Sequence, residues 1–265
     1  MFYQIKYTSI VLDGLELKSD KYAFTISNIF DFDKSYSSTD TYSNGKVYAS
    51  SKVEDKKILL NGYVKGNITD FLALNKMLNR KDLLTLKVAI EGFKTVEAKV
   101  LIGNKGISTD GVNAFSCELI AFDPYLYGDK LIAELGIETY TGMTFPITFP
   151  VAWNGSSHKI TNITNNGNCE AYPIITISGP CQNITINNIT TGDAIWVDIA
   201  LTQFDTLVID NTEANRGLYL NGKRVIEIKK GNWLKCVEGL NSFSVYFESN
   251  SNNKLVKIEM IERFI

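Results

Sequence analysis

The sequence is poor in the residues that most often carry out chemistry. Its 265 residues include one histidine, His158, and four cysteines that form no Cys-x-x-Cys pair. These residues cannot complete the usual Cys/His zinc pattern, so we expect no metal site. The sequence also lacks a G-x-S-x-G, an H-E-x-x-H, a P-loop and a G-x-G-x-x-G motif. We therefore predict no cofactor and no catalytic residue, and we interpret His158, in the polar segment NGSSHKI, as a surface-loop histidine.

The few cysteines lie far apart in the sequence. They are Cys117, Cys169, Cys181 and Cys236. This scatter is typical of reduced, mostly buried thiols in a protein made in a reducing cytoplasm. A Cys169–Cys181 disulfide is the alternative that the spacing leaves open.

Long apolar runs and an excess of one charge are also missing. The formal net charge of −2 indicates no specific nucleic-acid binding, because phosphate binding needs an excess of Lys and Arg. No apolar run approaches the roughly 20 residues of a membrane helix, and MFYQIKYTSIVLDG does not have the pattern of a secretory signal. We expect no membrane contact. Asn-x-Ser/Thr sequons at Asn67, Asn154, Asn162, Asn183 and Asn188 are then explained by an Asn-rich composition rather than by glycosylation.

Alternating apolar residues, the pattern of half-buried strands, dominate the rest. A hairpin is predicted from Leu84 to Ile102 in the segment DLLTLKVAIEGFKTVEAKVLI, with its turn at Glu91-Gly92. Strands are also predicted in KKILLNGYVKG before it and in FSCELIAFDP after it. The first half is therefore expected to be mainly β.

One helix and one polar segment interrupt this pattern. The helix is predicted in NITDFLALNKMLNRKD, where apolar residues recur every three or four positions and Asn67 or Thr69 can cap the start. The segment SYSSTDTYSNGKVYASSK, residues 35–52, is low in aliphatic residues and is predicted to be a long loop or mobile arm. Long loops in compact domains usually bind something or reach a neighbour.

A domain boundary is predicted between Asp123 and Pro150. The first β-rich unit ends in FDPYLYGDK, and a proline-punctuated segment follows. After it come short strands with turn signals and no convincing helix, which is the pattern of a β-sandwich. We therefore predict two domains, residues 1–130 and 131–265.

Four charged residues in the segment TLVIDNTEANRGLYLNGKRVIEI, residues 206–228, could form an acid–base site or the polar edges of a hairpin. They are Asp210, Glu213, Arg216 and Arg224. The strands TLVIDN and LYLNG, a type I′ turn at Asn221-Gly222 and a positive φ at Gly217 are all predicted here, which puts the charges at strand ends. Glycosidase chemistry would instead need two carboxylates facing each other across a cleft. The hairpin is the favoured interpretation.

Three tryptophans are the candidates for a sugar-stacking platform. Trp196, in AIWVDIA, is predicted to lie in the core or on a sheet surface, and Trp233, after a Gly-Asn turn, is the better candidate for exposure. Core packing is the favoured interpretation for each of them, Trp153 included.

Three segments of the second half carry a resemblance to a known family: PIITISGPCQNITINNITTGD, FDTLVIDNTEANRGLYLNG and GNWLKCVEGLNSFSVYFES. Together they resemble the C-terminal domain of the distal tail proteins of siphophages. The matching positions are Pro173, Gly179, Asn188 to Gly192, Ile209-Asp210, Asn221-Gly222 and Gly239-Leu240-Asn241. Each supplies a turn residue where a sandwich strand must reverse. The strands and the single helix of the first half are similar to the N-terminal domain of the same family.

This resemblance implies a structural protein rather than an enzyme. Residues 1–130 would form a tail-tube-like β-sandwich or barrel with one α-helix, which assembles a hexameric ring. Residues 131–265 would form a galectin-like antiparallel β-sandwich. The ring would join the tail tube protein to the tail tip and carry receptor-binding proteins, in a virion assembled in the host bacterial cytoplasm. No ligand-binding residue is assigned.

The alternative is a carbohydrate-binding module, because galectin-like sandwiches bind sugars in other families. A sugar site needs exposed aromatic rings and convergent polar groups, and the sequence shows candidates without a clear cluster. An enzyme is the least favoured of the three.

Overall fold

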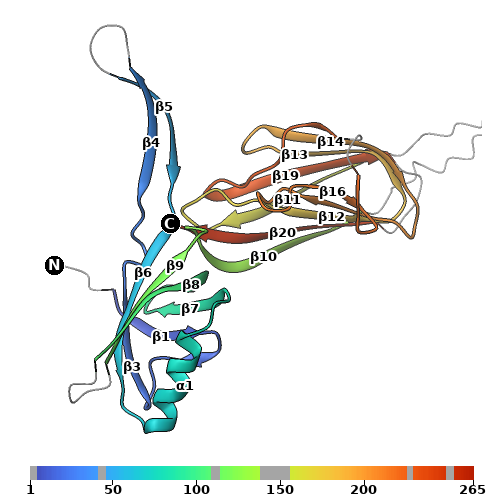
Figure 1. Cartoon of the computed structure of the whole chain (residues 1–265). Coiled ribbons are helices and arrows are strands. Elements are labelled where there is room, and N and C mark those ends of the chain that lie inside the picture. Colours follow the sequence, from blue (N-terminus) through green and yellow to red (C-terminus); the bar gives the residue numbers. More distant parts are fainter. Residues whose placement is uncertain (1–4, 41–45, 109–113, 138–155, 226–228, 249–253) are drawn as a thin grey trace, which may run out of the picture. The chain divides into compact units, whose positions relative to one another are not determined.

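The computed structural model describes residues 5–40, 46–108, 114–137, 156–225, 229–248 and 254–265 (Figure 1). The chain divides into two compact units. Unit 1 comprises Met1–Asp129 and Phe264–Ile265, and unit 2 comprises Lys130–Arg263. The protein is mainly β, its strands pair antiparallel, and one helix lies in the described part, so the predicted fold class is confirmed at this level.

Unit 1 is built from strands that pair in the order β2-β1-β7-β8-β9-β6-β3. Their bounds are β1 (Tyr7–Leu12), β2 (Leu15–Glu16), β3 (Tyr22–Ser27), β6 (Lys56–Val64), β7 (Leu84–Ile90), β8 (Thr95–Ser108), β9 (Ala114–Ala121) and the start of β10 (Leu126–Ile137). The long strand β8 pairs with β7 along residues 95–100 and with β9 along residues 101–108. It also pairs with β10 at Glu97 and Tyr127, so β8 has three neighbours. The apolar side chains of these strands enclose one core.

The predicted hairpin from Leu84 to Ile102 is confirmed as β7 and β8. In β7 the buried and less buried residues alternate from Leu84 to Ile90, as the period of two requires. Gly92 has a φ of 74°, a conformation that glycine adopts at little cost, and so allows the turn at Glu91-Gly92.

Helix α1 (Ile68–Leu78) covers part of this core. Its N-cap is Asn67, one of the two predicted residues, whose side-chain oxygen accepts from the amides of Thr69 and Asp70 at 3.0 and 3.1 Å. Leu74 and Leu78 are buried, which fixes the face that α1 turns to the sheet.

Within the predicted loop, the described residues 35–40 and 46–52 are not a loop. They lie in two paired strands, β4 (Lys34–Asp40) and β5 (Lys46–Val53), which form a ribbon that projects from unit 1 (Figure 1). A half-buried strand alternates polar and apolar residues, but this ribbon has no buried face, and β5 is exposed from Lys46 to Lys52. The sequence therefore lacked the alternation that would have predicted strands.

The end of the chain contributes to unit 1. Phe264, near the end of β20 (Lys254–Phe264), belongs to the unit 1 core with 4% of its surface exposed. Its ring meets that of Phe93 edge-on, with 5.2 Å between the centroids. Unit 1 therefore joins two distant pieces of sequence.

Unit 2 is a sandwich of two antiparallel sheets, as predicted for the second half. One sheet has the order β17-β16-β15-β12-β20-β10, and the other has the order β11-β19-β13-β14-β18. The further bounds are β11 (Ser156–Asn165), β12 (Ile174–Ser178), β13 (Cys181–Asn188), β14 (Asp193–Leu201), β15 (Thr206–Asp210), β16 (Gly217–Leu220), β17 (Lys223–Val225), β18 (Lys229–Gly231) and β19 (Gly239–Glu248). Buried side chains of both sheets, such as Ile209 and Phe243, form one core.

The turn chemistry of unit 2 is largely as predicted. Asn221 and Gly222 both have positive φ, 50° and 78°, which is the type I′ pattern, and Gly239 has a φ of 89°. The prediction for Gly217 is wrong, because it starts β16 without a positive φ. A Cβ on Gly217 would lie 3.2 Å from Nε of Arg224, so the glycine makes room for that side chain.

Candidate functional site

Two charged residues of the segment 206–228, Asp210 and Arg224, stabilise their own turns. The carboxylate of Asp210 is buried and accepts from the amide and the hydroxyl of Thr212 at 2.8 and 2.6 Å, which closes a turn at the end of β15. Arg224 donates to the carbonyl of Arg216 at 3.1 Å, across the hairpin. Asp210 thus holds a backbone turn, and Arg224 holds the base of the β16–β17 hairpin.

Glu213 joins a stack around Tyr172. It accepts from the Tyr172 hydroxyl at 3.3 Å and pairs with Arg263 at 3.3 Å. The guanidinium carbons of Arg263 and Arg216 lie 5.1 and 5.7 Å from the centre of the Tyr172 ring, within cation–π range. Burial, and then the nearby Glu213 carboxylate, raise the pKa of Tyr172. Asp210 and Glu213 therefore face different partners, and the absence of a catalytic role for them remains a prediction.

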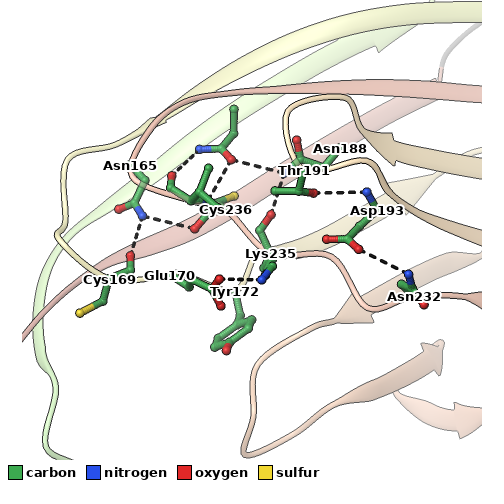
Figure 2. A network of polar contacts seen from close by, with 12 residues as sticks. Asn165, Cys169, Glu170, Tyr172, Asn188, Thr191, Asp193, Asn232, Lys235 and Cys236 are labelled. Atoms are coloured by element: carbon green, nitrogen blue, oxygen red, sulfur yellow. Dashed lines mark hydrogen bonds and ion pairs between the residues drawn. The ribbon is translucent and has the colours of Figure 1, made fainter.

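Four asparagines with no exposed surface, which we call the buried amides, hold the loops of unit 2 together. They are Asn165, Asn188, Asn211 and Asn241. Figure 2 shows part of this network, around Asn165, Asn188 and the segment through Lys235 and Cys236. A buried amide is costly unless its donors and acceptors are satisfied, and each of these asparagines both donates and accepts.

The buried amides converge on residues 234–238, which connect β18 to β19 outside the strands and include one isolated bridge, between Cys236 and Ala171. Asn211 accepts from the amide of Leu234 at 2.8 Å, and Asn188 donates to the carbonyl of Lys235 at 2.6 Å. Asn241 accepts from the amide of Val237 at 3.0 Å and donates to its carbonyl at 2.8 Å. The network replaces the backbone bonds that a strand would have made, so its role is to fix loops.

The four cysteines are free thiols. The Cys169–Cys181 disulfide left open by the sequence is not formed. Burial raises the pKa of Cys236 to about 12 and that of Cys117 to about 11, so both stay protonated and unreactive at neutral pH.

Trp196 is more exposed than Trp233, which is the reverse of the prediction. Trp196, on β14, is 46% exposed on the surface of its sheet, whereas Trp233 is partly buried against the unit 2 core. Trp233 follows a turn, but the buried amides draw that segment inwards. Trp153 lies outside the described residues, as does the side chain of His158, whose backbone is in β11.

The β4–β5 ribbon is the most exposed apolar feature of unit 1. Tyr36 is 75% exposed and Tyr48 is 64% exposed. Tyr48 pairs with Ser38, two residues along β4 from Tyr36, so the two phenol rings share a face of the ribbon. An isolated two-stranded ribbon is marginally stable in water, so apolar rings on such a ribbon indicate a contact surface.

A shallow groove of about 480 Å³ lies elsewhere in unit 1, beside the paired ends of β6, β8 and β9. Gly62, Gly106 and Phe115 are among the residues that line it. Within the described ranges, no group of three or more metal-ligating side chains is present. No helix in the described part is long and apolar enough to cross a membrane.

Part of the sequence matches a known protein family. Residues 166–264 match the family described as "Siphovirus-type tail component, C-terminal domain", a family of structural phage tail proteins. No curated protein matches the sequence.

The whole chain has the fold of a solved tail protein. It is similar to the crystal structure of the Dit protein of phage SPP1, with a TM-score of 0.66, 12% sequence identity, and coverage of 97% of this chain and 99% of that one. That protein is described as a paradigm of the hub adsorption apparatus in phages infecting Gram-positive bacteria. A chain of the activated phage p2 baseplate also matches, with a TM-score of 0.47, 13% identity, and coverage of 97% and 98%. The predicted resemblance to siphophage distal tail proteins is confirmed.

Proposed function

We propose that this chain is a structural adaptor of a phage tail tip. Six copies form a ring that joins the tail tube protein to the tip and carries receptor-binding proteins, in a virion assembled in the host bacterial cytoplasm. The match of residues 166–264 to a siphovirus-type tail component carries the proposal. The likeness of the whole chain to the fold of a hub protein supports it.

In this proposal unit 1 is the tail-tube-like part and makes the ring contacts. A ring needs two different complementary surfaces on each subunit. The exposed rings of Tyr36 and Tyr48 on the β4–β5 ribbon are suited to one of them. Unit 2, a galectin-like sandwich whose loops are fixed by its own amides, faces outwards and offers attachment sites.

The mass of the purified chain in solution tests this proposal. One subunit has a mass of 29.6 kDa, so a hexamer should scatter light as a particle of about 178 kDa. A strictly monomeric chain at the highest soluble concentration, which also fails to bind purified tail tubes, would contradict the adaptor role.

Two fragments assign the contacts to a domain. Residues 1–130 should retain the tendency to form rings at high concentration, and residues 131–265 should be folded and monomeric. The first fragment lacks Phe264, so it should be less stable than unit 1 in the full chain. If the second fragment is oligomeric and the first is monomeric, the ring contacts lie in the second domain and the proposed assignment is wrong.

A further inference from the structure

The outer face of the β11-β19-β13-β14-β18 sheet carries one exposed aromatic ring among polar side chains. Trp196 is 46% exposed there, although burial of an indole is strongly favourable. Leaving such a ring in water is informative when the surrounding surface is polar, because no apolar neighbour explains it.

The indole lies close to the backbone of Gly231. Gly231 pairs with Ile195 on the neighbouring strand and has a φ of 85°. A Cβ at this position would lie 2.6 Å from Cζ3 of Trp196, so only glycine allows the ring to lie where it does. The close approach of Gly231 restricts the positions open to the indole, which reduces the entropy lost when a ligand stacks on it.

Uncharged hydrogen-bonding groups lie beside the ring on the same face. Thr185 pairs directly with Trp196, and Tyr246 pairs with Thr185 on the next strand. Asn187 stands two residues along β13, and its amide donates to the hydroxyl of Ser244 at 3.4 Å. By strand spacing, Tyr246 lies about 10 Å from Trp196, roughly the length of a disaccharide.

Charge on this part of the face is sparse and balanced. Asp198 lies two residues along β14 from Trp196, and Lys230 pairs with Trp196 from β18. One acid and one base offer no field for an anionic polymer. The exposed Ile160 is on edge strand β11, three strand spacings or about 14 Å from Trp196, so it does not extend the ring into an apolar patch.

We propose that this face binds a neutral saccharide, with one sugar ring stacked on Trp196. Thr185 and Asn187 hydrogen-bond to its hydroxyl groups, and Tyr246 contacts a second sugar unit. A sugar has an apolar ring face and a rim of hydroxyl groups, which matches a fixed indole bordered by hydroxyls and an amide. This site goes beyond the proposed adaptor role and does not depend on ring formation. A flat, open face predicts weak binding, with a Kd in the millimolar range for one chain.

Fluorine NMR of the full chain containing 5-fluorotryptophan tests the site. The signal of Trp196 is assigned by its loss in Trp196→Tyr. Chitobiose, cellobiose, lactose and maltose are titrated separately, and at least one should shift that signal in a saturable way. Trp196→Ala should abolish the binding seen by calorimetry, and Asn187→Ala should weaken it by about tenfold. Trp196→Tyr should retain it within about threefold, because a phenol ring still stacks.

The matched control is Phe204→Ala, which removes another exposed aromatic ring of unit 2 and should leave binding unchanged. Equal melting temperatures of the variants exclude unfolding as the cause of lost binding. The proposal is wrong if none of the four sugars shifts the Trp196 signal at up to about 50 mM. It is equally wrong if Trp196→Ala reduces only the binding of another tail protein, because the face is then a protein contact.

Discussion

The two units differ in how they treat segments that lie outside their main sheets. Unit 2 turns polar loop residues inwards, and four fully buried asparagines bind backbone groups of residues 234–238. Unit 1 does the reverse with the β4–β5 ribbon, which exposes Tyr36 and Tyr48 and buries no face. A region that satisfies its own polar groups can stand alone, whereas a ribbon with exposed rings gains stability only from a neighbour. The contrast predicts where mutations should affect folding and where they should affect assembly.

The largest expected effect is on unit 1, which needs the end of the chain. Phe264→Ala removes a ring that is 4% exposed in its core and should lower the stability of unit 1 by about 3 kcal/mol. Urea unfolding, monitored separately in each unit by hydrogen exchange, should show the loss of stability in unit 1 alone. Phe204→Ala, at a ring that is 84% exposed, should change stability by less than about 0.5 kcal/mol. An unchanged unit 1 in Phe264→Ala would show that the chain end is not part of it.

The next effect concerns unit 2. Asn241→Ala removes the acceptor for the amide of Val237 and the donor to two carbonyls, and leaves these groups buried. We expect a loss of about 2–3 kcal/mol in the urea unfolding of unit 2. Asn162→Ala is the control, because Asn162 is exposed and accepts only from Ser242 in the contacts described. Equal losses in the two variants would show that burial of the amide is not what matters.

The structure also separates the features that the sequence could predict from those that it could not. Strands such as β7, with alternating burial from Leu84 to Ile90, were predictable because one face must enter a core. The ribbon was missed because it has no such face. An Asn-rich segment predicts turns, but exposed and buried asparagines have the same polarity. The role of Asn188, which donates to the carbonyl of Lys235, therefore depends on distant backbone that no local pattern encodes. The exposure of Trp196 and the membership of Phe264 in unit 1 are set by tertiary contacts in the same way.

A smaller effect, on assembly and not on folding, is expected at the ribbon. The double variant Tyr36→Ser and Tyr48→Ser removes both rings from one face of the β4–β5 pair. It should weaken self-association by about tenfold or more while the unfolding free energy of unit 1 stays nearly constant. Light scattering over a concentration series measures the first, and urea unfolding measures the second. Self-association that is equal to that of the unmodified chain would assign the ring contact to another surface.

The smallest effects are expected at the charged residues that first suggested a catalytic site. Asp210→Ala opens one turn and should cost about 1 kcal/mol, and Glu213→Ala should cost less, since that carboxylate is 59% exposed in its pair with Arg263. His158→Ala should have no measurable effect on infectious particle assembly. A hydrolytic activity of the chain that disappears in any of these three variants would refute the prediction that none is catalytic.

The burial of Asn188 has a consequence for making the protein in a eukaryotic secretory system. Asn188-Ile189-Thr190 is an acceptor sequence for N-linked sugar, and transferases act on the nitrogen of the asparagine side chain. In the folded chain that nitrogen lies in the interior and donates to the carbonyl of Lys235. Attachment of a glycan there and closure of the sandwich exclude each other. Sugar found on Asn188 would therefore mark the molecules that had failed to fold.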